Sequence, residues 1–451
     1  KRYPVVEHGI DKLLAKSGTL RGREAKITLD LPKRKPESTE MTVQVTPSLA
    51  AALLDALPYL IDYPYGCTEQ TMSRFLPAVA VAKTLRDQGI APADIAGRMF
   101  GGIEAAYADH THPQGKKDLA QLDTMVAQGV ARLKDMQHQD GSWGWWKADV
   151  SDPYMTAYVV WGLSLAQEAG APVDPAVLER GAAWLRLKLV EFERDPTLQA
   201  WLLHGLAAYR HAQRGALQMS AEEKAAFATL WKARGRLGAY GRALFALSAQ
   251  HYNRTEEAKT LARNLIDGAQ VDDTPDTSVV LEGAPATLPT ALATAHWGQE
   301  RGYRHWTEGG IEATAFALRA LLAIDPTHPL VAQSCVWLVK NRRGAQWTNT
   351  RDSAIAVLAL NDYLRATGEL ATDADYEVLV NGKSVAKQRV AAKDALAAPA
   401  RRRMRTSLSP SLSSVRSTRR RDRGDGPLYF AVQASFFSLE EPGTAAGNEI
   451  F

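Results

Sequence analysis

Cys67 and Gln70 are the pair of residues in this sequence whose types and spacing could carry out unusual chemistry. They stand three positions apart, so one turn of chain brings the two side chains to the same side. The Cys67 sulfur could then attack the side-chain carbonyl carbon of Gln70 and expel ammonia, which leaves an internal γ-glutamyl thioester. Gly66 allows an unusual backbone angle beside the sulfur, and Pro64 stiffens the approach. The alternative is an incidental cysteine at the start of a helix.

The other cysteine, Cys335, has a different setting. It lies within the apolar helical pattern of residues 331–339, and we expect it to be a buried packing residue. Two cysteines cannot build a disulfide framework, and these two lack the paired spacing of a zinc site. The sequence therefore predicts neither a metal nor another cofactor.

Composition places the chain among globular proteins. Of its 451 residues, 45% are hydrophobic and 23% are charged, which excludes a disordered or fibrous chain. The net charge of +4 originates in residues 401–423, which hold nine Arg and one Asp; outside them remain 45 of the 54 basic and 49 of the 50 acidic residues. A nucleic-acid-binding protein needs basic residues spread over a folded face, so we expect no nucleic-acid partner.

Residues 47–365 are expected to form helical hairpins, because Ala and Leu recur at intervals of three and four with Gly and Pro at the breaks. Three similar helices contain Thr156, Thr314 and Ser353 near their starts, and each follows a loop with a tryptophan, at Trp143, Trp306 and Trp347. Such hairpins cannot bury their apolar faces alone, so neighbours must stack. A closed ring is one solution.

Strand patterns flank the helical block on both sides. Residues 1–46 include alternating segments at 25–31 and 41–45. Residues 376–380 precede Asn381-Gly382, a strong hairpin turn. We therefore predict a mainly α fold, an α/α toroid inserted into a small β-sandwich whose second half spans residues 366–440, with a strand at 428–437.

Two segments fall outside this pattern. Residues 401–423 are rich in Arg and Ser without periodicity, so we expect them to be disordered; they resemble either a solvated basic loop or a translation of the wrong reading frame. Residues 441–451 are expected to begin a further domain, since both ends of the sequence look like cuts through a longer polypeptide.

The stretch Tyr63-Pro64-Tyr65-Gly66-Cys67-Thr68-Glu69-Gln70-Thr71-Met72-Ser73-Arg74 resembles the thioester motif of the α2-macroglobulin and complement family, in its bacterial branch. The loop Asp140-Gly141-Ser142-Trp143, preceded by a Gln, resembles a loop of α/α-toroid proteins. The resemblance implies a toroidal thioester domain and a CUB-like sandwich.

The family resemblance also implies a mechanism. An endopeptidase cleaves a bait region, the thioester becomes exposed, and a protease Lys amine attacks the Gln70 carbonyl, so that the protease is trapped covalently without turnover. Tyr63, Tyr65 and Met72 are candidates for shielding the thioester from water, or for core packing. The expected partners are target endopeptidases and the other domains of the full-length protein. The bacterial relatives imply a periplasmic protein anchored to the inner membrane.

The sequence departs from the branch of the family that acylates hydroxyl groups. That branch carries a histidine soon after the Asp-Gly turn, whereas residues 141–156 contain none. His138 precedes the turn and His204 follows much later; we interpret His204 as a helix residue with a structural role. The difference predicts attack by amines rather than by hydroxyls.

Three other functions stay open at this point. The toroid could be a binding scaffold whose thioester never forms. It could be a terpene-cyclase-like enzyme, although its nearest acidic pair, Asp373 and Asp375, lies outside the helical block. Cys67 could be the nucleophile of a cysteine peptidase, which would need a histidine partner.

Overall fold

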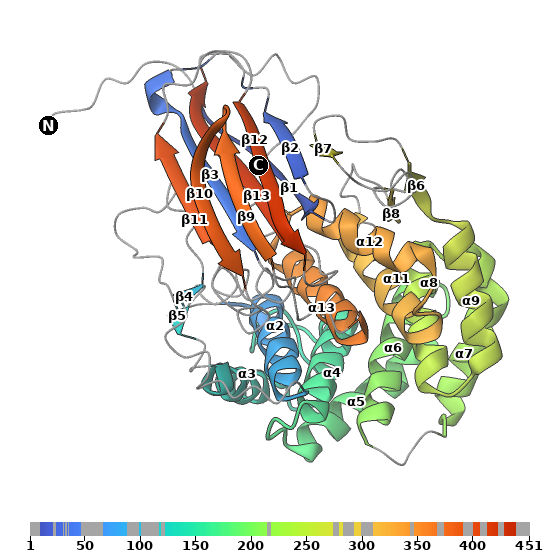
Figure 1. Ribbon diagram of the computed structural model, residues 1–451. Helices are drawn as coiled ribbons and strands as arrows, with labels where there is room; N and C mark the ends of the chain where they lie inside the picture. The colour runs from blue at the N-terminus through green and yellow to red at the C-terminus, as the bar shows by residue number, and fades with distance from the viewer. Residues whose placement is uncertain are drawn as a thin grey trace, which may run out of the picture.

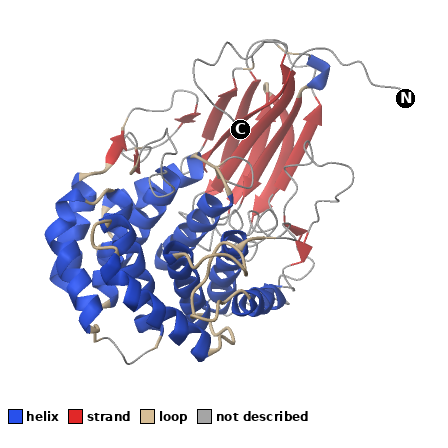
Figure 2. Cartoon of the chain, turned by 180° about the vertical axis from the view of Figure 1, so that it is seen from behind, coloured by secondary structure: helices blue, strands red, loops and turns tan. Residues whose placement is uncertain are grey.

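The computed structural model describes most of the helical block and the strands on either side of it. The residues described are 10–20, 24–29, 31, 34, 36–46, 66–87, 99–100, 117–118, 122–213, 218–273, 279–282, 293–298, 310–342, 347–367, 374–390, 400–405, 413–422 and 428–438. Within them the helices gather in one half of the molecule and the long strands in the other (Figures 1 and 2).

The helical half is a closed ring. Six helices form its inner layer, each in contact with the next: α2 (Thr68–Asp87), α4 (Pro153–Glu168), α6 (Pro196–Ala212), α8 (Ala239–His251), α11 (Gly310–Ile324) and α13 (Thr350–Thr367). The ring closes because α13 packs against α2, where the Thr84 hydroxyl donates to Asn361 Oδ1 at 2.7 Å. The predicted α/α toroid is therefore confirmed.

A second set of helices packs around the inner ring: α3 (Leu122–Asp135), α5 (Pro175–Glu191), α7 (Ala221–Ala233), α9 (Thr255–Asp267) and α12 (Pro329–Lys340). A short 3₁₀ helix, η4 (Arg234–Arg236), follows α7. Outer helix α5 and inner helices α4 and α6 each begin with an aspartate cap followed by proline, as at Asp174-Pro175, where the Asp174 side chain accepts the Ala176 N–H. Proline is suited to this first position because no helical partner exists there for an N–H.

One tryptophan contact recurs around the ring. The backbone N–H of a buried tryptophan donates to a hydroxyl on the next inner helix, and its indole N–H donates to a carbonyl at the end of the preceding outer helix. The three sets are Trp143 with Thr156 and Leu133, Trp297 with Thr314 and Leu265, and Trp347 with Ser353 and Leu338. The residue expected at the second position was Trp306, which lies outside the described residues; Trp297 occupies that position.

The strands form a two-layered sandwich. One sheet has the order β1 (Ile10–Leu20), β13 (Leu428–Ser438), β3 (Glu40–Thr46) and β11 (Ala400–Arg405). The other has the order β10 (Lys383–Val390), β9 (Ala374–Val380), β12 (Ser413–Asp422), β2 (Glu24–Leu29) and β7 (Val279–Glu282). Apolar side chains of both sheets form one core, for example Ile27 and Val378 against Val43 and Val432.

The sandwich joins segments from both ends of the described chain. Strand β1 pairs with β13, and β3 lies between β13 and β11, all antiparallel. At the β9–β10 turn, Asn381 and Gly382 both have positive φ, as the Asn-Gly pair predicts. An insertion of the ring between two halves of one β domain is thus confirmed. Strand β7 was not predicted: it comes from inside the helical block and pairs with β2.

The expectation of disorder at residues 401–423 is wrong for most of that segment. Strand β11 pairs with β3, and β12 lies between β9 and β2 inside the second sheet. The arginine-rich sequence has few apolar residues to stabilise a strand. Backbone hydrogen bonds with the neighbouring strands of each sheet provide this stabilisation instead. Residues 441–451 lie outside the described part of the chain.

Smaller elements complete the fold: η1 (Pro36–Ser38), the pair β4 (Met99–Phe100) and β5 (Lys117–Asp118), and the pair β6 (Gln270–Asp272) and β8 (Thr294–His296). In the part of the chain that the structure describes, no helix combines the length and apolar character needed to cross a membrane.

Candidate functional site

Cys67 lies directly before the first residue of α2, at the position that caps the helix. It is buried, with 7% of its surface exposed. Its backbone N–H donates to the side-chain oxygen Oε1 of Gln70 at 3.3 Å. The structure therefore brings together the two residues that the sequence singled out.

This contact has a local cause. In a capping box, the third residue of a helix turns its side chain back to the backbone N–H of the capping residue. Gln70 is the third residue of α2 and does this to Cys67. The same contact fixes the carbonyl group that the Cys67 sulfur would attack, and it directs a hydrogen-bond donor at the oxygen on which charge would develop.

Gly66 has a steric role beside this turn. A Cβ atom added to Gly66 would lie 2.9 Å from the Cβ of Gln70 and 3.2 Å from its Oε1. Distances below 3.0 Å are not tolerated between such atoms, so a side chain at this position would displace Gln70. The close approach of the Gln70 side chain to Gly66 therefore explains the glycine at this position. It is a second reason, besides the backbone freedom inferred from the sequence.

Hydrogen bonds from α3 and from α2 itself hold the turn from both sides. Arg132 of α3 donates to the carbonyl of Gly66 at 2.9 Å and to the hydroxyl of Thr71 at 3.3 Å. Thr71 in turn donates to the carbonyl of Cys67, through its hydroxyl at 2.9 Å and through its N–H at 3.0 Å. Arg132 was not among the expected site residues, because its contacts depend on how α3 packs beside α2.

The loop between α3 and α4 forms the third support. The carbonyl of Trp145 accepts the N–H of Thr68 at 2.8 Å and the Thr68 hydroxyl at 3.3 Å. Thr68 is the residue after Cys67. The Asp-Gly-Ser-Trp loop recognised in the sequence thus contacts the first turn of α2 directly.

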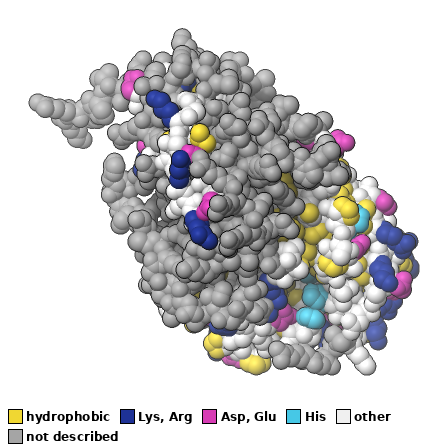
Figure 3. Space-filling view, viewed as in Figure 1, with side chains coloured by type: hydrophobic (Ala, Val, Ile, Leu, Met, Phe, Trp, Pro, Cys, Tyr) yellow, Lys and Arg dark blue, Asp and Glu magenta, His cyan; other side chains and the backbone are white. Residues whose placement is uncertain are grey.

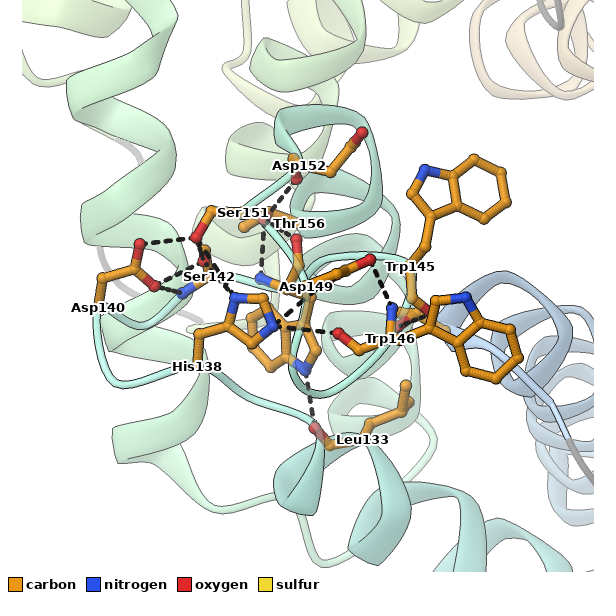
Figure 4. A network of polar contacts seen from close by, with 12 residues as sticks. Leu133, His138, Asp140, Ser142, Trp145, Trp146, Asp149, Ser151, Asp152 and Thr156 are labelled. Atoms are coloured by element: carbon orange, nitrogen blue, oxygen red, sulfur yellow. Dashed lines mark hydrogen bonds and ion pairs between the residues drawn. The ribbon is translucent and has the colours of Figure 1, made fainter.

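A polar network makes this loop rigid (Figure 4). Asp140 accepts from the N–H and hydroxyl of Ser142, from the Ser151 hydroxyl and from the indole N–H of Trp184. Burial alone would raise the pKa of Asp140, but these donors outweigh it and the pKa is lowered. The carboxylate is therefore the hub of the loop. Gly141, with φ of +91°, lies against the backbone of Arg180, where no side chain would fit.

His138 belongs to the same network. Its Nδ1 lies 3.3 Å from the Ser151 hydroxyl, and its Nε2 lies 3.2 Å from the carbonyl of Trp146 and 3.8 Å from Asp149 Oδ1. Figure 4 shows the ring among these loop residues. These contacts give His138 a structural role in the loop.

The electrostatic setting of Cys67 differs from that of a catalytic cysteine. Burial raises the pKa of its thiol; a hydrogen bond with the backbone of Gln70 lowers it and the negative charge of Glu69 raises it, with a net shift upward. Nucleophilic cysteines of peptidases have a lowered pKa, because a positive neighbour stabilises the thiolate. A Cys67 thiol is therefore protonated at neutral pH, which argues against the peptidase alternative.

The candidate shielding residues have separate outcomes. Tyr63 and Tyr65 lie outside the described residues. Met72 is fully buried on the inner side of α2, where its methyl group packs against Gly162 of α4 so closely that a Cβ at Gly162 would collide with it. Met72 thus has a packing contact that accounts for its burial.

Two other residues behave as structural elements. Cys335 is buried within α12 in the main core. His204 of α6 is 1% exposed, and neither of its ring nitrogens has a hydrogen-bond partner among the described residues. It packs against the rings of Trp161, Trp201 and Phe316, and burial lowers its pKa well below the ordinary value.

No group of three or more His, Cys, Asp or Glu side chains among the described residues could hold a metal ion. Of the acidic pair considered for a terpene-cyclase-like site, Asp375 lies in β9 of the sandwich, and Asp373 is outside the described part. On the face shown in Figure 3, basic and acidic side chains of the described helices lie interspersed.

Comparison with known protein families identifies the segment that carries this turn. Residues 40–189 match the A-macroglobulin TED domain. This segment is therefore similar to the A-macroglobulin TED domain. The matched segment includes Cys67, Gln70, the supporting Arg132 and the whole Asp-Gly-Ser-Trp loop.

The curated relatives are an α2-macroglobulin and a thioester-containing protein. The α2-macroglobulin of Thermotoga maritima is 33% identical over 185 residues, which cover 41% of this chain and 10% of that protein. Thioester-containing protein 1, allele R1, of Anopheles gambiae is 25% identical over 166 residues, which cover 36% of this chain and 10% of that protein. The match spans about a tenth of the length of these curated relatives.

Solved structures share the fold over almost the whole chain. Salmonella α2-macroglobulin reacted with methylamine has a TM-score of 0.58 at 16% identity, with 96% of this chain and 24% of that chain covered. Native α2-macroglobulin of Escherichia coli, from domain MG7 to the C-terminus, has a TM-score of 0.55 at 16% identity, with coverages of 96% and 58%. The chain thus shares its fold with these α2-macroglobulins, and the family match in sequence lies in residues 40–189.

Proposed function

We propose that this chain is the thioester-bearing part of a protease trap, in which Cys67 and Gln70 form an internal thioester. The observation that carries the proposal is the contact of the Cys67 N–H with Gln70 Oε1 at the start of α2, inside a TED domain. The Arg132 and Trp145 contacts support it, because they hold the turn that both residues share.

Formation of the thioester would follow from this geometry. The Cys67 thiol adds to the side-chain carbonyl carbon of Gln70, the carbon–nitrogen bond breaks, and ammonia leaves with the thiol proton. The Cys67 N–H can stabilise the oxyanion of the intermediate, as preorganised backbone donors do in acyl-transfer enzymes.

In the capture of a protease, the Cys67 sulfur would be the leaving group, as ammonia is in the formation of the thioester. A Lys amine of the protease attacks the same carbon, the carbon–sulfur bond breaks, and an amide forms while Cys67 takes up a proton as a free thiol. The group is consumed, so the reaction has no turnover. Because burial and Glu69 raise the pKa of the thiol, the thiolate is a poor leaving group in this setting, which favours a long-lived thioester before activation.

The partners and compartment follow as parts of the same proposal. The targets are endopeptidases that cleave a bait region elsewhere in the full-length protein, and the sandwich acts as a CUB-like neighbour of the TED domain. We place the protein in the periplasm, anchored to the inner membrane. The methylamine-reacted Salmonella protein supports the choice of an amine as acyl acceptor, since that relative has the same fold.

The test is the reaction of the purified chain with methylamine. A thioester predicts that methylamine is incorporated at Gln70 with release of one thiol, assigned to Cys67 by peptide mapping. A protein that incorporates no amine, and whose Cys67 can be alkylated from the start without any prior exposure to amines, would instead be the scaffold of the alternative hypothesis.

A further inference from the structure

A chain of buried polar side chains leads from the thioester turn into the centre of the ring. Glu69, between Cys67 and Gln70, is only 6% exposed, and its Oε1 accepts a hydrogen bond from the Ser73 hydroxyl at 2.5 Å. The Ser73 hydroxyl lies 3.4 Å from the hydroxyl of Tyr158 on α4, and both side chains are fully buried.

Tyr158 connects this hydrogen bond to a buried ion pair. The guanidinium carbon of Arg351, on α13, lies 4.8 Å from the centre of the Tyr158 ring. Arg351 donates to Glu312 Oε1 on α11 at 2.6 Å, and the two side chains are 3% and 2% exposed. Burial opposes the charge of Arg351, but Glu312 outweighs it and keeps the pKa of Arg351 above its ordinary value.

These residues gather at one end of the ring. Glu69, Glu312 and Arg351 each lie in the first turn of their inner helix, as does Tyr240 of α8, whose hydroxyl is 3.4 Å from Arg351. The buried pair is therefore at the same end as Cys67. A buried ion pair contributes little net stability compared with apolar residues of similar size. Its position beside the thioester turn suggests a different role.

We propose that Ser73 and Tyr158 are positioning residues for the thioester: they hold Glu69 toward the Arg351–Glu312 pair and thereby fix the first turn of α2, in which Cys67 and Gln70 meet. This inference rests on the proposed function. The physical reason is that the first turn of a helix has free N–H groups and frays easily. An intramolecular reaction loses roughly 100-fold in rate when the reacting atoms are displaced by about 1 Å.

The experiment compares Ser73→Ala and Tyr158→Phe with the unchanged chain. Each variant removes one hydroxyl from the connection and leaves Cys67 and Gln70 in place. We expect the fraction of molecules that carry the thioester, measured by intact mass, to fall, and hydrolysis of the remainder to accelerate roughly tenfold, the effect of losing a hydrogen bond to a charged group. The double variant should be no worse than the more severe single variant, because both act through Glu69.

Ser164→Ala is the matched control. Ser164 is an equally buried serine on α4 whose hydroxyl donates to the carbonyl of Val160 at 2.6 Å, away from this connection. It should keep the thioester at the level of the unchanged chain, and urea denaturation should show how much stability each variant loses. A variant that is as stable as Ser164→Ala and yet lacks the thioester has lost positioning rather than folding.

A second readout concerns the thiol itself. After methylamine treatment, the pH midpoint of Cys67 alkylation reports the pKa of the thiol, and Ser73→Ala should shift it to lower pH because Glu69 is no longer held in place. Ser164→Ala should not shift it. If the unchanged chain never forms a thioester, the proposed function itself fails. If it does, and both hydroxyl variants behave like Ser164→Ala, only the positioning role is overturned.

Discussion

The carbonyl oxygen of Trp145 accepts two hydrogen bonds from Thr68, one from the backbone N–H at 2.8 Å and one from the hydroxyl at 3.3 Å. These two residues are 77 positions apart and join the Asp-Gly-Ser-Trp loop to the residue that follows Cys67. The loop therefore does more than fill the space between two helices. It holds the N–H of the first residue of α2, one of the groups that the helix leaves free.

Thr68→Pro should separate this contact from the stability of the helix. Proline is tolerated at the first position of a helix, where it favours an extended conformation of the preceding residue. It has neither the N–H nor the hydroxyl that Thr68 donates to the carbonyl of Trp145. We expect faster hydrolysis of the thioester, by several-fold, and the urea midpoint measured alongside gives the stability lost when the Trp145 carbonyl loses both donors. The measurement is the appearance of free thiol over time at neutral pH.

Thr68→Ser is the control for that experiment, because it keeps the N–H and the hydroxyl. Its thiol release should match that of the unchanged chain. Equal release from the proline and serine variants would show that the Trp145 contact has no influence on the thioester.

The tryptophan–hydroxyl contact that recurs around the ring predicts a stability effect. Thr156→Val removes the acceptor for the N–H of Trp143 and leaves that buried group unpaired, which costs about 1–3 kcal/mol. The change should appear as a lower urea midpoint. Thr260→Val, on the exposed side of α9, removes a hydroxyl whose partner is accessible to water and should cost much less. Equal losses at the two positions would contradict the structural role of the contact.

The buried histidines predict sensitivity to acid. Burial, with His211 and Arg319 nearby, lowers the pKa of His251 from 6.5 to about 3, and the pKa of His204 lies well below its usual value as well. The unfolded chain therefore binds more protons than the native chain between these values. The contribution of His251 to the free energy of unfolding should fall as the pH drops below about 6.5 and level off near pH 3.

His204→Phe tests this explanation. Phenylalanine keeps an aromatic ring against Trp161 and Phe316 but cannot titrate. Urea unfolding of this variant should depend less on pH between 7 and 5, roughly in the range where unperturbed histidine gains its proton. An unchanged pH dependence would locate the acid sensitivity elsewhere.

Sequence reasoning recovered the parts of the fold that depend on local patterns. The Asn381-Gly382 turn follows from backbone preferences of two adjacent residues. The meeting of Cys67 and Gln70 follows from their spacing of one helical turn. In each case neighbours in sequence decide the structure, so the residue types suffice.

The failures share the opposite property. Strand β12 has an arginine-rich sequence that offers no strand pattern, and its two neighbours in the sheet, β9 and β2, come from opposite ends of the chain. Trp297 and not Trp306 was the residue to look for, but which of them reaches Thr314 depends on the path of the loop between them. Arg132 was missed because α3 and α2 meet only in the folded ring.

The roles of the two cysteines give a test by substitution. Cys67→Ala should abolish methylamine incorporation, because no acyl donor can form. Gln70→Glu should do the same, since a carboxylate cannot acylate the Cys67 sulfur without prior activation. Cys335→Ser should leave thiol release at Cys67 unchanged, because Cys335 is a buried part of α12. If thiol release disappears in Cys335→Ser but persists in Cys67→Ala, the thioester is formed by Cys335 and not by Cys67, which contradicts the account.

The most direct test of the account is the intact mass of the freshly purified chain, measured together with alkylation of its two cysteines. A Cys67–Gln70 thioester predicts a mass that is lower than the sequence mass by one ammonia molecule, and a Cys67 that resists alkylation under denaturing conditions until methylamine is added. A chain of full sequence mass, with Cys67 alkylated at once and no earlier exposure to amines or to hydrolysis, would contradict the central claim.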